Sequence, residues 1–291
     1  MITIDLEDPK AVEAFYKKSK DILLNKMGTK KFRCFSMWLE VNSTSLKELL
    51  TADYMKLLAL LGPLSTARPK YPYKDFKNDM LKAYRALSSS KNKRSFSSLD
   101  FVNSVGIRVC PYCNRNFVFN ASSRNRTCEL DHFFNKDEFP FFALSFFNLV
   151  PSCGLCNRYK STREIDISPY DNNVDWTSHY KFNLEIKKST ILSVNDFDFR
   201  LEVLSKEFSL NANCFRLEEL YECHKEEVLE LLNRKQIFCK SQIDEIREKY
   251  KGLIPSRKQA NKIIFGHGID KKNLQKTPLC KMLSDIFESD E

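Results

Sequence analysis

Hydrophobic residues recur at helical spacing through most of the first hundred positions. Apolar side chains three and four residues apart define one face in three stretches, within residues 12–23, 46–58 and 76–87. This period predicts amphipathic helices that each bury one face. Residues 88–98 (SSSKNKRSFSS) lack the period and predict a polar, basic linker, followed by a short helix at 99–105. The first third of the chain is therefore expected to be helical.

The pattern changes beyond this point. Residues 106–170 show no long helical period, whereas residues 181–205 alternate apolar and polar positions, as in FNLEI and FDFRLEV. A period of two predicts half-buried strands, so we expect a pair of strands in this stretch. Helical spacing returns from 215 to about 250 and near 256–265 and 278–288. We expect an α+β fold, with mainly helical flanks around a central unit, divided into residues 1–104, 105–170 and 171–291.

Composition is that of a globular protein. The 291 residues are 42% hydrophobic and include 23 phenylalanines and only 7 glycines, which excludes a low-complexity or disordered chain. A phenylalanine-rich run at 133–147 is expected to form core, with stacking on bases as the alternative. No apolar run is long enough to span a bilayer, and no secretion signal is visible. We expect a cytoplasmic protein with no membrane partner.

Positive charge is concentrated near the N-terminus. The net charge is +9, and residues 1–100 hold 19 basic against 11 acidic residues. A local basic surplus is what a phosphate backbone would select, although a modest surplus is also common without any such partner. Lys91, Lys93 and Arg94 in the polar linker form the densest basic cluster. They are candidate nucleic-acid contacts, with a solvated loop as the alternative.

Four of the ten cysteines are paired, as Cys110-Pro-Tyr-Cys113 and Cys153-Gly-Leu-Cys156. A reducing compartment disfavours a disulfide framework, whereas two such pairs suit tetrahedral Zn²⁺ with four thiolate ligands. Four protein ligands leave no open position, so this zinc would be structural and its binding energy would become folding energy. The alternatives are a redox pair or chance spacing.

An acid and a histidine adjoin each other between the two cysteine pairs, as Asp131-His132. Neighbouring residues on a strand point to opposite faces, but at a strand end they can flank one metal-bound phosphate. A carboxylate suits Mg²⁺, and a neutral imidazole suits the abstraction of a proton from water. Asp131 and His132 are therefore candidate catalytic residues.

In its order of motifs, the central region resembles the HNH endonuclease family, in the branch that carries a structural zinc. The resemblance covers about residues 105–165 and implies a ββα-metal unit that hydrolyses phosphodiester bonds of DNA, with RNA not excluded. The matching elements are Cys110-x-x-Cys113, Asp131-His132, Asn148-Leu149, Cys153-x-x-Cys156-Asn157 and Lys160.

The resemblance implies a role for each matching residue. His132 matches the general base, and Asp131 and Asn157 match the ligands of one catalytic divalent ion, Mg²⁺ or Mn²⁺. Asn148 matches the asparagine that holds the loop and orients the histidine, and the four paired cysteines match the zinc ligands. The candidate phosphate contacts in this unit are Arg158 and Lys160.

A wider frame, LDHFF followed by ALSFFNLVPSC and CN, resembles bacterial HNH proteins of anti-phage defence. The nearest groups are the HNH subunits of Septu systems and related retron-associated effectors, which work beside an ATPase subunit. The resemblance therefore implies an ATPase partner. Two alternatives stay open: a noncatalytic zinc-dependent nucleic-acid-binding module, and a nuclease subunit that is silent until an ATPase binds it.

Overall fold

The chain is organised in two compact units. The computed structural model describes residues 1–6, 8, 10–67, 69, 71–89, 96–122 and 125–289. The N-terminal unit comprises Thr3–Tyr112 and Phe117–Val174, and the C-terminal unit comprises Met1–Ile2, Cys113–Asn116 and Asp175–Glu291. The predicted divisions at 104/105 and 170/171 stay predictions.

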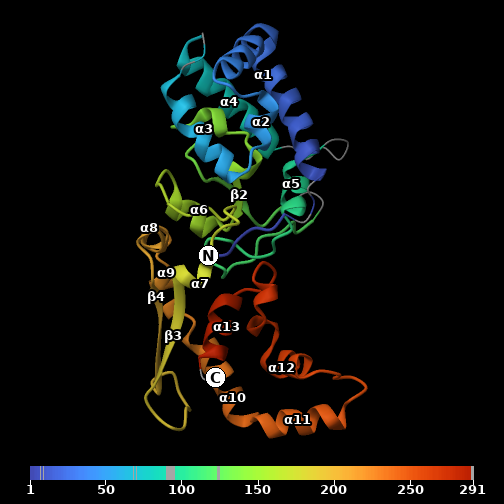
Figure 1. Ribbon diagram of the computed structural model, residues 1–291, viewed down its shortest axis with the longest axis vertical. Helices are drawn as coiled ribbons and strands as arrows, with labels where there is room; N and C mark the ends of the chain where they lie inside the picture. Colours follow the sequence, from blue (N-terminus) through green and yellow to red (C-terminus); the bar gives the residue numbers. More distant parts are fainter. Residues whose placement is uncertain are drawn as a thin grey trace. The chain divides into compact units, whose positions relative to one another are not determined.

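The described residues form thirteen α-helices and two small antiparallel sheets, so the α+β prediction is confirmed (Figure 1). Each sheet has two strands, and helices account for most of the regular structure. None of the described helices combines the length and the apolar character needed to cross a membrane.

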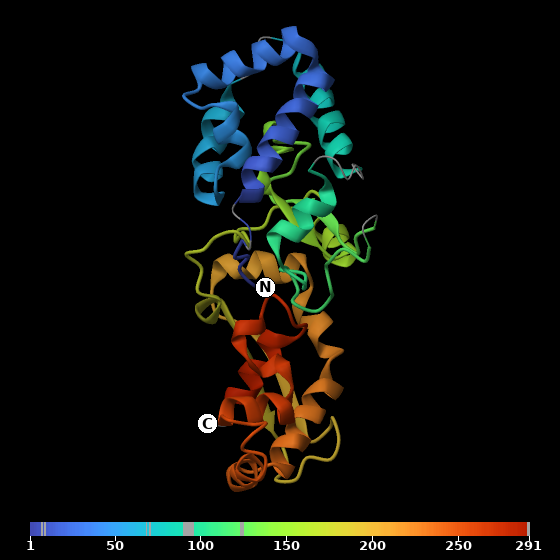
Figure 2. The same ribbon diagram turned by 90° about the vertical axis from the view of Figure 1, so that its right-hand side faces the viewer.

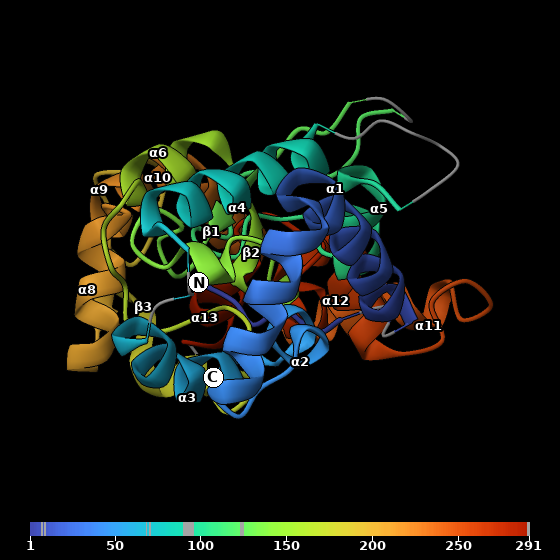
Figure 3. The same cartoon turned by 90° about the horizontal axis from the view of Figure 1, so that it is seen from above.

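Five helices open the N-terminal unit, as the apolar period predicts. Serine or aspartate side chains cap three of them by accepting a backbone N–H three residues further on, at Ser45, Asp53 and Ser97. The first helix is interrupted at Gly28, whose φ of 73° costs glycine no steric strain. These helices are α1 (Lys10–Val41), α2 (Leu46–Thr51), α3 (Tyr54–Thr66), α4 (Tyr73–Ser88) and α5 (Ser98–Val105), and α1 runs beside α4 (Figures 2 and 3).

Aromatic rings join these helices to the segment between the cysteine pairs. Phe15 of α1 lies 5.1 Å from Phe146, centroid to centroid, and Tyr54 of α3 meets Phe133 edge-on at 5.5 Å. Such pairs add to the energy of area burial. The prediction that the phenylalanine-rich run forms core is confirmed, because five of its seven rings are buried: Phe133, Phe134, Phe141, Phe142 and Phe146.

A short hairpin and a helix follow in the same unit. Strand β1 (Glu129–His132) pairs antiparallel with β2 (Leu149–Ser152), so that His132 lies opposite Leu149. The helix α6 (Gly154–Lys160) begins two residues after β2. Two strands and a helix therefore follow one another in the order that the resemblance implies.

The C-terminal unit is built on the second hairpin. Strands β3 (Tyr180–Ile186) and β4 (Phe197–Val203) pair antiparallel along their whole length, which confirms the predicted strand pair. Alternate residues are buried, and β4 packs on α8 and α9 whereas β3 packs on α13. The helices are α7 (Trp176–His179), α8 (Lys206–Cys214), α9 (Leu217–Glu222), α10 (Lys225–Ile237), α11 (Lys240–Lys249), α12 (Arg257–Phe265) and α13 (Cys280–Glu288).

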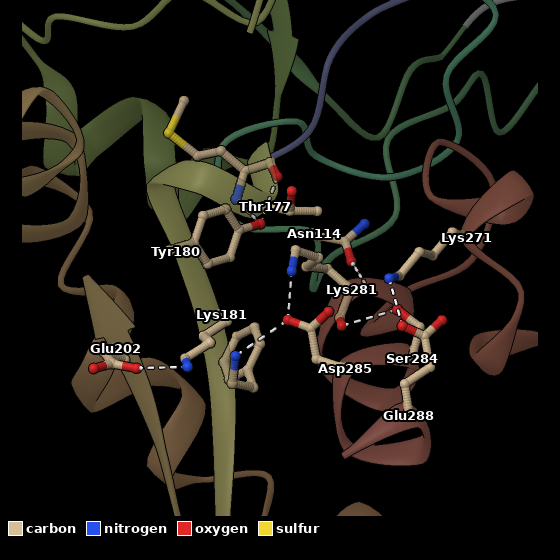
Figure 4. A network of polar contacts seen from close by, with 12 residues as sticks. Asn114, Thr177, Tyr180, Lys181, Glu202, Lys271, Lys281, Ser284, Asp285 and Glu288 are labelled. Atoms are coloured by element: carbon tan, nitrogen blue, oxygen red, sulfur yellow. Dashed lines mark hydrogen bonds and ion pairs between the residues drawn. The ribbon is translucent and has the colours of Figure 1, made fainter. Parts of the chain in front are cut away.

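A buried ion pair holds α13 in the C-terminal unit (Figure 4). The ammonium of Lys281 pairs with Asp285, whose Oδ2 also accepts the N–H of Phe182 in β3 at 3.1 Å. The Oδ1 of Asn114 accepts the N–H of Lys281 at 3.1 Å. Both charges are nearly inaccessible to water and each has a partner, as buried charges require. The helix is thereby tied to the hairpin and to segment Cys113–Asn116.

Substitution of two adjacent leucines in α3 tests whether the buried face of this helix stabilises the unit. Leu57 is fully buried and Leu58 is 44% exposed, so Leu57→Ala should destabilise the unit by about 2–5 kcal/mol. Leu58→Ala should change stability by less than about 0.5 kcal/mol. Both are measured by urea unfolding in a Trp176→Phe background, in which Trp38 reports on the N-terminal unit alone. Equal losses in the two variants would contradict this packing.

Candidate functional site

Four cysteine side chains converge at one point, and they are the two predicted pairs. The sulfur atoms of Cys110, Cys113, Cys153 and Cys156 all lie within 4.8 Å of one another, and all four residues are buried. Backbone N–H groups point at two of the sulfurs, from Cys153 to Cys110 at 3.3 Å and from Cys156 to Cys153 at 3.5 Å. Such donors stabilise thiolates. The cluster can hold a metal such as zinc, and four thiolates would leave no coordination position for another ligand.

An asparagine fastens the loop between the two strands. Asn148 is fully buried, and its Oδ1 accepts the N–H of Phe134 at 2.7 Å. Its Nδ2 donates to the carbonyl oxygens of Phe134 at 3.2 Å and Phe142 at 3.0 Å. The side chain thus makes three hydrogen bonds to the backbone of the loop that follows His132. These bonds hold the loop in place, and the orienting role that the resemblance implies for Asn148 stays a prediction.

The ring of His132 is held in one orientation. Its Nε2 lies 3.0 Å from the carbonyl oxygen of Ala143, which can only accept, so Nε2 carries the proton and Nδ1 keeps its lone pair. Tyr84 of α4 packs edge-on against the imidazole, with 4.4 Å between centroids, and donates its hydroxyl to Leu130 at 3.0 Å. Burial, reinforced by the charge of Lys136, lowers the pKa of His132 to about 3. The imidazole is therefore neutral at physiological pH.

A buried lysine joins the two candidate catalytic residues. The ammonium of Lys160 donates to the carbonyl oxygen of His132 at 2.6 Å and lies 3.4 Å from Oδ2 of Asp131. The hydroxyl of Tyr112 donates to the same Oδ2 at 2.6 Å. Burial raises the pKa of Asp131, and the positive charge of Lys160 and the Tyr112 hydrogen bond oppose that rise. The two partners therefore favour the ionised carboxylate.

Lys160 lies at the end of α6 with its side chain turned inward. Its side chain is 0% exposed, and its ammonium is directed at His132 and Asp131 rather than at solvent. The ammonium therefore holds the end of β1 in place, and the phosphate contact expected of Lys160 stays a prediction.

Asn157 of α6 lies at the same cleft as Asp131 and His132. Its Nδ2 donates to Oε2 of Glu129, which leaves the amide oxygen Oδ1 as the free ligand atom of that side chain. An amide oxygen and a carboxylate oxygen are hard donors of the kind that Mg²⁺ and Mn²⁺ prefer. Asp131 and Asn157 therefore each present an oxygen donor type that such ions bind, on the lining of the same cleft.

The cleft that these residues line has a volume of about 760 Å³. The cationic side chains on its lining are Arg126, Lys136 and Arg158. Arg126 is used for structure, because its guanidinium donates to Ser88, Ser98 and Cys128. Arg158 is exposed and Lys136 is half-buried, so these two are placed to meet a ligand in the cleft. Lys91, Lys93 and Arg94 lie outside the described residues.

Two tyrosines at the site escape sequence reasoning about chemistry. Tyr84 fits the apolar period of its helix, and only the structure brings it against His132. Tyr112 lies between the two cysteines of the first pair, where the sequence gives it no chemical role, yet its hydroxyl donates a hydrogen bond to Asp131. Glu129, two residues before Asp131 on the same strand, also lines the cleft, and its Oε2 accepts a hydrogen bond from Nδ2 of Asn157.

No family model, no curated protein and no solved structure matches this chain.

Metal analysis tests the cysteine cluster. The purified protein should contain about one zinc ion per chain, because four thiolates complete one tetrahedral site. Cys156→Ser should lose most of that zinc and unfold at lower urea concentration, whereas Cys223→Ser, at an exposed cysteine, should retain it. The readout is inductively coupled plasma mass spectrometry after dialysis. Retention of zinc in Cys156→Ser would show that the metal is bound elsewhere.

Replacing the buried lysine tests its structural role. Lys160→Met leaves the carboxylate of Asp131 buried without its cation, which should cost about 3–5 kcal/mol. Arg158→Met, at an exposed position of the same helix, should cost less than about 0.5 kcal/mol. Urea unfolding with Trp38 as the reporter measures both. A Lys160→Met variant as stable as the Arg158→Met variant would contradict the assignment.

Proposed function

We propose that this protein is a metal-dependent endonuclease of the HNH type that hydrolyses phosphodiester bonds of DNA. The observation that carries the proposal is the meeting of Asp131, His132 and Asn157 on one cleft. A protein that only binds nucleic acid has no need of an oriented imidazole beside two hard oxygen ligands. The sequence resemblance supports the same conclusion independently of the cleft.

In this proposal His132 is the general base. Its Nδ1 accepts a proton from the water that attacks phosphorus, and the P–O3′ bond breaks as the P–O bond to water forms. The hydrogen bond from Nε2 to Ala143 fixes the ring, and the three bonds of Asn148 fix the loop that carries Ala143. A phosphate entering the cleft brings negative charge, which raises the pKa of the imidazole toward the value a base needs.

Asp131 and Asn157 would hold the catalytic divalent ion, Mg²⁺ or Mn²⁺. Such an ion would supply positive charge that stabilises the leaving oxygen. The chain's own part is to present Asp131 as a carboxylate, through Tyr112 and Lys160, and to direct Oδ1 of Asn157 by holding its Nδ2 on Glu129. Arg158 and Lys136 are the proposed phosphate contacts of the cleft. Contacts of this kind carry little sequence information, so weak sequence preference is expected.

A nicking assay on supercoiled plasmid tests the proposal. With Mg²⁺ or Mn²⁺ the protein should nick the DNA, EDTA should abolish nicking, and His132→Ala should slow it by about 10²–10⁴-fold. The matched control is His267→Ala, at an exposed histidine of the C-terminal unit, which should cut at the normal rate.

Each outcome of the assay discriminates between functions. Cutting that survives in His132→Ala would overturn the assignment of the base. DNA binding without cutting, under every metal, would favour the noncatalytic binding module. Cutting of RNA in place of DNA would keep the mechanism and change the substrate.

We extend the proposal to a cellular role in anti-phage defence beside an ATPase subunit. The support for this extension is the sequence frame around the cysteine pairs, LDHFF and ALSFFNLVPSC, and not a feature of the cleft. If the nuclease is silent until it binds the ATPase, addition of that subunit should restore cutting in an otherwise inactive preparation.

A further inference from the structure

A second pocket lies in the C-terminal unit and has no part in the proposed nuclease reaction. It has a volume of about 450 Å³ and is formed by α10, α11, α12 and α13, which lie together in the lower part of Figure 1. Pockets of small-molecule size have volumes of roughly 300–1,000 Å³. The pocket is therefore large enough for a small molecule, and the chemistry of its lining indicates which class of ligand it would bind.

The walls of the pocket are apolar and largely aromatic. Phe265 lies 5.0 Å from Phe287, centroid to centroid, and Phe238 and Ile243 complete the apolar lining. Aromatic faces favour planar ligands, because stacking is worth more than the buried area alone. This surface suits a planar ring system.

Among the described residues, every charged residue that lines the pocket is cationic. Lys235 donates to the carbonyl oxygen of Phe287 at 2.8 Å and lies 5.1 Å from the centroid of that ring. The side chains of Lys240 and Arg257 form no ion pair or hydrogen bond with the rest of the described chain. Two cationic side chains beside an apolar wall, those of Lys240 and Arg257, fit an anionic group on the ligand.

The pocket also contains an acceptor without a donor. The side chain of Asn261 lines the pocket, and its Oδ1 is buried and receives no hydrogen bond from any described residue. A buried acceptor left unpaired costs free energy that a ligand donor would recover. The ligand should therefore carry an N–H or O–H group on its planar part.

We propose that this pocket binds a mononucleotide. The base lies against Phe265 and Phe287 and donates to Oδ1 of Asn261, while the phosphate contacts Lys240 and Arg257. The lining offers aromatic faces for a planar ring, an acceptor for a donor on that ring, and cations for an anionic group. A mononucleotide carries all three complementary groups. The proposal does not depend on the nuclease assignment.

The thiol of Cys239 provides a local reporter of occupancy. It is exposed, lines the pocket, and precedes α11, and hydrogen bonds from Ser241 and Gln242 lower its pKa, which favours reaction with an alkylating agent. AMP should slow the alkylation of Cys239 by iodoacetamide in a saturable way. Cys223 is also exposed but lies outside the pocket, so its alkylation, followed by peptide mass spectrometry in the same sample, should not change.

Calorimetric titration of the full chain with AMP, adenosine and inorganic phosphate tests the chemistry. AMP should bind at least about tenfold more tightly than either fragment, because only AMP engages both the rings and the cations. The double variant Lys240→Gln with Arg257→Gln should weaken AMP binding by at least about tenfold. Lys249→Gln, at the other end of α11 and away from the pocket, is the matched control and should leave binding unchanged.

Four results would overturn the proposal. They are the absence of AMP binding at millimolar concentration, equal binding of adenosine, equal binding of phosphate as an adventitious ion only, and unchanged AMP affinity in the double variant. Circular dichroism of each variant shows whether the fold is kept. If the double variant fails to fold, the comparison of AMP with adenosine and the protection of Cys239 still decide the question.

Discussion

Four sulfur atoms within 4.8 Å of one another, all on buried cysteines, are the constraint on which the central part of the structure depends. As thiolates around one metal ion, the four cysteines would form a cross-link between the residues before β1 and the residues after β2. A two-stranded sheet of four residues a strand is marginal by itself, so the cluster and the aromatic contacts with the helices keep the hairpin formed.

A second layer of organisation consists of polar side chains that are buried and fully used. The side-chain amide of Asn148 hydrogen-bonds to the loop backbone, and the ammonium of Lys160 contacts His132 and Asp131. Each tether removes a degree of freedom from a residue that faces the cleft. Buried polar groups of this kind cost free energy unless they are paired, which is why they occur here as closed sets.

The sequence predicts the local parts of this architecture well. Apolar spacing finds the helices of the first hundred residues and the alternation of β3 and β4, because one face of each element is buried and the period shows it. The spacing of the paired cysteines predicts that their side chains converge at one site. The contacts made by Tyr84, Tyr112 and Lys160 could not be predicted, because they depend on how segments far apart in sequence pack. A lysine at a helix end looks the same in sequence whether its ammonium points outward or is buried under a strand.

The wall that Tyr84 gives to the cleft has an evolutionary consequence. The imidazole of His132 packs against a ring from α4, so the surroundings of this histidine are not supplied by the hairpin and α6 alone. They include a helix encoded some fifty residues upstream. Recombination that moved residues 105–170 alone into another gene would leave the histidine without this ring, so we expect the hairpin and α4 to be inherited together.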